Sequence, residues 1–235
     1  MIFRKFEEVS AFDIKSLIEA GKPEGVQIEY KRELPSGSND DKKEFLADIS
    51  SFANTKGGDL IFGLDELRDE NGRSTGIPQA IAPIVENADA AIQRLDSMAR
   101  DGLAPRLSGF RLRAVPVEGG VVVLARIERS LAGPHQVTFQ GSGRFYSRNS
   151  AGKYQMDVGE IGRAFRGLAE LPRTLRQLHQ SRIDVILSDA PAPLLPGGKI
   201  IVHFVPISSF VDGVSLGRED VRRQSSVAAA AVGTT

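Results

Sequence analysis

The sequence contains no cysteine among its 235 residues. This absence excludes disulfide bonds, thiolate nucleophiles and cysteine-bound zinc, and it fits a reducing compartment. The chain also lacks net charge, because 30 Lys and Arg residues balance 30 Asp and Glu residues. A global electrostatic attraction to polyanions is therefore excluded, and any such binding needs a local basic patch.

Long apolar runs are missing as well. No run approaches the roughly 18 residues that a membrane helix requires. Glu7, Glu8 and Asp13 make the N-terminus unlike a signal peptide. We therefore expect a cytoplasmic protein with no membrane contact. The Gly-x-x-x-x-Gly-Lys-Ser/Thr motif is absent too, so the sequence gives little support to ATP binding of the P-loop type.

What the sequence does contain is a glycine turn between a helical pattern and an apolar run. Residues 41–53 carry apolar side chains at helical spacing, which predicts a helix with one buried face. Residues 54–58 follow as a tight turn whose glycines permit positive φ angles. Residues 60–62 are typical of a buried strand, and Asp65 is expected at its end.

The remaining patterns predict a fold of the α/β class, α+β in the strict sense. Helices are predicted at residues 10–20, 41–53, 86–101 and 157–169. Strands are predicted at residues 26–31, 60–62, 110–114 and 121–127, with a further hairpin at 137–148. We expect one mixed sheet of about five or six strands, packed by about four helices.

The composition changes near Pro172. We expect one domain over residues 10–170 and the start of a second module over residues 171–235. That second part is predicted to hold a linker helix, a strand at 199–206 and an alanine-rich tail at 225–235.

Three carboxylates and a lysine are candidates for a catalytic or metal-binding site. Glu29 and Lys31 are two residues apart and share one face of a predicted strand, and Glu24 lies five residues upstream of Glu29. If this strand neighbours the one before Asp65, the four side chains converge at one end of a sheet. Clustered carboxylates would suit Mg²⁺ or Mn²⁺. The alternative is a solvated Glu29–Lys31 pair, with Asp65 simply opening a loop.

Two further groups are candidates for binding. The backbone N–H groups of residues 54–58 could form an anion nest, or the glycines could only turn the chain. Arg144 and Arg148 flank Tyr146, which could stack on a base, although such charges are more often a solvated face.

The sequence resembles the Schlafen AlbA-type domain family over about residues 10–170. The resemblance rests on Glu29-Tyr30-Lys31, Phe52-Ala-Asn-Thr-x-Gly-Gly58, Leu60-Ile-Phe-Gly-Leu-Asp65, Gly76, Gly133-Pro134 and Phe145-Tyr-Ser-Arg-Asn149. In animal Schlafens three carboxylates support the cleavage of transfer and ribosomal RNA. The resemblance implies that Glu24, Glu29 and Asp65 are the matching metal-binding and catalytic acids, with Lys31 near the phosphate.

The resemblance also implies nucleic-acid binding, and the residues expected to carry it are Lys31, Asn54, Lys56, Arg144, Tyr146 and Arg148. RNA is favoured over DNA, and a role in bacterial defence and a homodimer are further expectations. Bacterial relatives are often labelled as ATP-binding proteins or transcription regulators. Whether the chain is an enzyme stays open, because a non-catalytic module that binds nucleotide or DNA and regulates an attached domain is the alternative.

Overall fold

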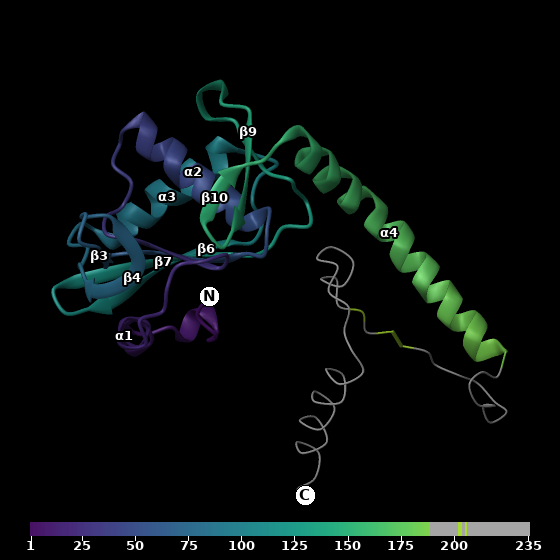
Figure 1. Ribbon diagram of the computed structural model, residues 1–235, viewed down its shortest axis with the longest axis horizontal. Helices are drawn as coiled ribbons and strands as arrows, with labels where there is room; N and C mark the ends of the chain where they lie inside the picture. Colours follow the sequence, from purple (N-terminus) through teal and green to yellow (C-terminus); the bar gives the residue numbers. More distant parts are fainter. Residues whose placement is uncertain (189–201, 204, 206–235) are drawn as a thin grey trace, which may run out of the picture. The chain divides into compact units, whose positions relative to one another are not determined.

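The structure is a computed structural model that describes residues 1–188, 202–203 and 205. The chain divides into two compact units, Met1–Phe165 and Arg166–Thr235. Every strand that the structure describes lies in the first unit (Figure 1). The predicted module from residue 171 onward lies largely outside the described residues, as do the strand at 199–206 and the tail at 225–235. The predicted domain boundary therefore stays a prediction.

The central sheet has four strands in the order β1-β2-β7-β6. Its members are β1 (Ile28–Lys31), β2 (Gly58–Phe62), β7 (Gly120–Ile127) and β6 (Phe110–Val117). β1 runs parallel to β2, whereas β7 is antiparallel to both of its neighbours, so the sheet is mixed. The condition set from the sequence, that the strand at 26–31 neighbours the strand at 60–62, is therefore met.

The other six strands form two further sheets. One sheet has the order β10-β9-β8-β5, and the other is the hairpin β3-β4. These strands are β3 (Leu64–Arg68), β4 (Ser74–Ile81), β5 (Leu103–Ala104), β8 (Gln136–Val137), β9 (Arg144–Asn149) and β10 (Gly152–Gln155). The predicted α/β (α+β) class is confirmed, but the strands are distributed over three sheets instead of one.

Four α-helices are present in the described residues: α1 (Ala11–Glu19), α2 (Asn39–Ala53), α3 (Ala88–Gly102) and α4 (Val158–Leu187). Short 3₁₀ turns occur at Phe6–Glu8 and Phe139–Gly141. All four predicted helices are found. The last one continues through Pro172, although proline supplies no N–H for the helical hydrogen bond, so the expected change at that residue does not end the helix. No helix in the described ranges is long and apolar enough to cross a membrane.

The two faces of the central sheet carry separate cores. Leu60 and Phe62 of β2 pack with the apolar face of α2, whereas Ile61 between them packs with Ile14 of α1. Alternate residues of a strand point to opposite faces, so β2 is buried on both sides, as predicted. Figure 1 shows α2 and α3 on one side of the sheet and α1 on the other.

One buried ion pair crosses the middle of this sheet. Arg126 interrupts the apolar run of β7, and its Nε lies 2.7 Å from Oδ1 of Asp59 on β2. The same guanidinium donates to the carbonyl oxygens of Ile2 and Arg4 at 2.9 and 2.8 Å. The pair therefore fastens the N-terminal segment to the sheet.

The glycine turn after α2 is required by close backbone approach. Gly57 has a φ of 66°, and a Cβ atom at this position would lie 2.6 Å from the carbonyl oxygen of Ile127. Gly58 has an ordinary φ, but its Cβ would meet the Phe52 ring at 2.6 Å. These contacts support the structural interpretation of the turn.

Gly57→Ala should therefore destabilise the fold more than Gly72→Ala. Gly72 has a φ of 75° and no atom within 4 Å of its added Cβ, so this matched variant measures the backbone cost alone, about 1–2 kcal/mol. Gly57→Ala should cost about 2 kcal/mol more, because the neighbouring backbone must move. Urea unfolding monitored by circular dichroism gives both values, and equal losses would contradict this account.

Candidate functional site

Glu29 lies at the centre of a buried group of charges. The residue is 7% exposed, and its Oε1 and Oε2 lie 2.6 Å from Nζ of Lys31 and 2.5 Å from Nη1 of Arg148. Burial alone raises the pKa of Glu29, but the charges of Lys31 and Arg148 outweigh it and hold that pKa below its usual value. The predicted common face of Glu29 and Lys31 is confirmed, although both are drawn into a network instead of being freely solvated.

Two acids of α2 complete this network. The Asp48 side chain is 1% exposed, and its Oδ1 lies 2.6 Å from Nζ of Lys153 on β10. Glu44 also pairs with Lys153, and the Lys31 ammonium lies 3.7 Å from both acids. Burial raises the pKa of Asp48, and the negative charge of Glu29 adds to the effect. Three cations and three acids from β1, α2, β9 and β10 thus balance one another.

A cavity of about 420 Å³ opens beside this network, and we call it the Glu24 cavity. The side chains of Glu24, Glu29, Arg148 and Lys153 line it, together with residues 74–76 and 150–152. Two of the three predicted acids, Glu24 and Glu29, therefore face the same space.

Glu24 is only lightly engaged by the protein. Its Oε1 accepts a hydrogen bond from the Tyr30 N–H at 2.6 Å, and its own N–H donates to the carbonyl oxygen of Gly76. Burial raises the pKa of Glu24 to about 7, although the Tyr30 N–H opposes this shift. The negative charges of Glu29 and Glu66 raise the pKa further.

Asp65 does not join the other two acids. Gly63, with a φ of 97°, ends β2, so Asp65 falls inside β3 and not at the end of the buried strand. Its Oδ2 lies 2.7 Å from Nη1 of Arg32, and its side chain is 23% exposed. The Arg32 hydrogen bond lowers the pKa of Asp65. The neighbouring residue Glu66, and not Asp65, influences Glu24. Its carboxylate accepts a hydrogen bond from the Gly76 N–H at 3.1 Å, and its negative charge raises the pKa of Glu24.

The three predicted carboxylates therefore do not fit a divalent metal ion as they are arranged. No group of three His, Cys, Asp or Glu side chains within residues 1–188, 202–203 and 205 could hold one. Glu29 is already neutralised by two cations, and Asp65 by Arg32. The Mg²⁺ or Mn²⁺ site stays a prediction from the family resemblance.

Three of the residues expected to bind nucleic acid have internal partners: Lys31, which pairs with Glu29, and also Asn54 and Arg148. The Asn54 amide donates to the carbonyl oxygens of His135 and Tyr146 at 3.0 and 2.9 Å, and it accepts from the His135 N–H at 2.7 Å. Asn54 thus joins the end of α2 to β9 and to the loop before β8. Arg148 is 4% exposed and lies over the Phe52 ring, whereas Lys56 is exposed.

Arg144 and Tyr146 line a second cavity, of about 290 Å³, which we call the hairpin pocket. Lys43 of α2 and Lys153 of β10 border the same pocket, together with Asp40 and Glu44. Lys153 therefore lines both the hairpin pocket and the Glu24 cavity. Arg144 and Tyr146, both expected to bind nucleic acid, therefore face the same cavity, and their role in binding stays a prediction.

Sequence reasoning missed Lys43, Glu44, Asp48 and Lys153. A signal was available for Asp48, because this carboxylate falls within the run from Phe45 to Ala53 that α2 buries almost completely. Lys153 offers no comparable signal, since its partners are more than 100 residues away in the sequence.

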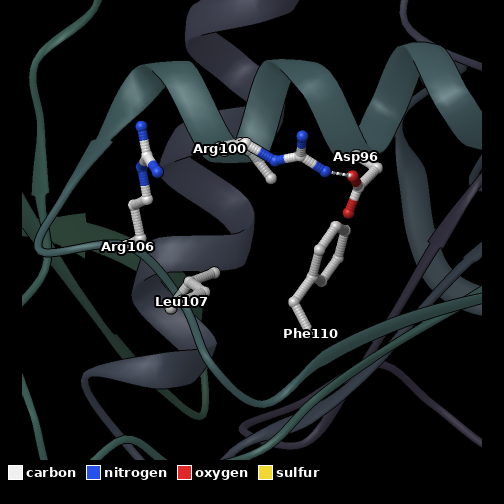
Figure 2. A pocket seen from close by; sticks show the side chains of 6 residues that line it. Asp96, Arg100, Arg106, Leu107 and Phe110 are labelled. Carbon is white, nitrogen blue, oxygen red and sulfur yellow. Dashed lines mark hydrogen bonds and ion pairs between the residues drawn. The ribbon is translucent and has the colours of Figure 1, made fainter.

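A third and smaller cavity, of about 240 Å³, lies between α3 and the segment before β6. Figure 2 shows the Arg100 guanidinium turned toward Asp96, with which it pairs, while Arg106 stands apart on the other side. Leu107 and Phe110 supply its apolar lining, and the cavity shares no lining residue with the other two.

The raised pKa of Glu24 predicts a pH-dependent stability. A carboxyl group with a higher pKa in the folded chain binds its proton more tightly there, so the free energy of unfolding falls as pH rises from about 4.5 to about 7. Because Glu24 is only half-buried, we expect on the order of 1 kcal/mol.

Urea unfolding at pH 5 and pH 8 checks this expectation. Glu24→Gln should be more stable relative to wild type at pH 8 than at pH 5, whereas Glu19→Gln, at an exposed glutamate of α1, should show no such change. If both variants showed the same change in stability between pH 5 and pH 8, Glu24 would not be the source of the pH dependence.

Comparisons with known proteins place the chain in a family. The family model described as Schlafen, AlbA_2 matches residues 24–157. This range contains the charged network, every residue that lines the hairpin pocket, and all but Pro23 of those that line the Glu24 cavity. No curated protein matches the sequence.

Two solved structures show partial similarity. The N-terminal domain of a RecG-related protein from Nitrosomonas europaea is 20% identical, with a TM-score of 0.45, and the match covers 64% of this chain and 94% of that domain. A Corynebacterium diphtheriae protein is 18% identical, with a TM-score of 0.41, over 65% of this chain. The match spans 27% of the length of the Corynebacterium protein. On the strength of the family model, which covers more than half of its residues, the chain belongs to the Schlafen AlbA_2 family.

Proposed function

We propose that this domain binds nucleic acid through the hairpin pocket. The observation that carries the proposal is the convergence of three cations from separate elements, Lys43, Arg144 and Lys153, around the half-buried ring of Tyr146. Lys153 is already held by Glu44 and Asp48, so the positive charge left for a ligand is that of Lys43 and Arg144, opposed by Asp40, while the whole chain is neutral. A local basic patch is what binding by a neutral chain requires.

The chemistry of the pocket favours a single strand. Lysine and arginine side chains bind phosphate oxygens regardless of sequence. A tyrosine ring can stack on any base, but only on one that is not already stacked within a duplex. Membership of the Schlafen AlbA_2 family is consistent with this role.

RNA cleavage is a finer proposal that rests on the family resemblance. It would use Glu24 and Glu29, which face one cavity, and it would also require the contribution of Asp65, which is paired with Arg32 elsewhere. Binding is common to an endoribonuclease and to a non-catalytic regulatory module. We therefore propose binding as the function of the domain. Cleavage of the RNA, and any preference for RNA over DNA, can be measured with the same labelled strands that test binding.

Binding of a fluorescently labelled single-stranded RNA should weaken when Arg144 is changed to Gln. Loss of one phosphate contact should reduce the slope of log affinity against log salt by about 0.7. Arg106→Gln removes the same charge from the third cavity and should leave both the affinity and the slope unchanged. Fluorescence anisotropy over a salt series measures both quantities. Equal effects of the two variants would reject the hairpin pocket as the contact surface.

Tyr146 provides a separate check on stacking. Tyr146→Phe should retain the affinity, whereas Tyr146→Ala should cost about 1–3 kcal/mol, the usual value of one stacked base. Circular dichroism must first show that both variants are folded, because Tyr146 also packs against the core. An affinity for duplex equal to that for the single strand would contradict the stacking role.

A further inference from the structure

We propose that helix α4 joins two copies of this chain as an antiparallel coiled coil. The contact surface is an apolar stripe along the helix, which we call the α4 seam. The seam takes no part in the binding of nucleic acid by the hairpin pocket, so the two proposals are independent.

The α4 seam has the residue spacing of a coiled coil. Apolar side chains recur along the helix at intervals of three, four and seven residues, which are the a and d positions of a heptad. They are Ile161, Ala164, Leu171, Leu175, Leu178 and Val185. From Glu170 to Arg182, every leucine, isoleucine, valine or aromatic residue lies at one of these positions. A stripe this narrow fits one facing helix, whereas a helix that packs on a globular core carries a broader apolar face.

The second compact unit holds no described helix that could face this seam. Among its described residues, α4 is the single helix. Leu171, Leu175 and Leu178 are half-buried, and Val185 is 42% exposed. Of the residues described beyond α4, His203 lies against the flank of the seam, where its Nδ1 is 3.0 Å from Nδ1 of His179 at an e position. Pairing with a second helix would remove the apolar a and d side chains from water.

Arg182 determines the direction of the partner helix. It occupies an a position, and in a parallel pair each a position faces the same residue of the other copy. Two arginines would then meet within the seam, which is unfavourable for like charges. In an antiparallel pair, a positions face d positions instead. The register that pairs the whole seam places Arg182 opposite the partner's Ala164, whose small side chain leaves room for the guanidinium group.

The same register also suits the other positions. Leu171 faces the partner's Leu175 on both sides of the centre, and Ile161 faces the partner's Val185 at each end. Apart from Glu160, the flanking e and g positions carry no Asp, Glu, Lys or Arg: they are Phe165, Gly167, Pro172, Thr174, His179, Ser181 and Ile186. The remaining charged residues lie away from the seam, at Arg163, Arg166, Glu170, Arg173, Arg176 and Asp184. A second copy therefore meets the seam without repulsion between like charges, which favours it as the partner.

The first test measures the mass of the full chain by size-exclusion chromatography with light scattering over a wide range of concentrations. Wild type should form a dimer. Leu175→Glu places a charge at the centre of the seam in both copies, so it should raise the dimer dissociation constant by about 100-fold or more. Ile183→Glu adds the same charge at a b position of the same helix and should leave the dimer intact. Circular dichroism shows whether both variants keep their helix.

The second test determines the direction of the pair by cross-linking, which the absence of cysteine makes simple. Residues 161 and 185 are about 36 Å apart along a helix, at 1.5 Å per residue. Ile161→Cys and Val185→Cys, mixed in equal amounts and oxidised, should therefore form a disulfide-linked heterodimer. Neither variant should cross-link with itself when it is oxidised alone.

Three outcomes overturn the proposal. A wild type that stays monomeric while Leu175→Glu lowers its thermal stability would show that the chain covers its own seam. A dimer that Leu175→Glu and Ile183→Glu weaken equally would have its interface elsewhere. Cross-linking of each cysteine variant with itself would show a parallel pair. RNA binding by a monomeric chain would leave the proposed function of the hairpin pocket unaffected.

Discussion

The carboxylate of Glu29, held between Lys31 and Arg148, is the interaction on which the site depends. Lys31 belongs to β1 of the central sheet and Arg148 to β9 of the second sheet, so one acid ties the two sheets together. Removing one partner of a buried pair leaves an uncompensated charge, which costs several kcal/mol. Because Glu29 and Arg148 both line the Glu24 cavity, loss of this charge balance would also disturb the walls of that cavity.

Helix α2 also holds the residues around Glu29 in place. Its Asp48 neutralises Lys153, its Ser51 contacts Arg148, and Asn54 at its end joins the loop of His135 to β9. The apolar face of the helix packs on the central sheet, whereas these polar side chains contact β9 and β10 of the second sheet. A single helix thus contacts residues that line both cavities, Lys153 and Arg148 among them.

Much of this fold could be predicted from local patterns. Capping residues and apolar periodicity located all four helices, and the glycine turn was correctly predicted to join α2 to a buried strand. The shared face of Glu29 and Lys31 followed from strand alternation. Asp65 was misplaced because Gly63 breaks the strand two residues earlier. Asp48 stood within a run of apolar helix residues and could have been noticed, but its pairing with Lys153 joins residues more than 100 positions apart, which no local pattern encodes.

The position of Lys153 between two cavities couples them electrostatically. Its ammonium group borders both hollows and is anchored to Asp48 and Glu44 between them. A ligand that attracts the Lys153 ammonium group toward one cavity would lower the positive electrostatic potential in the other. Ligands bound in the two cavities would then be thermodynamically linked, and each would change the affinity of the other by the same factor.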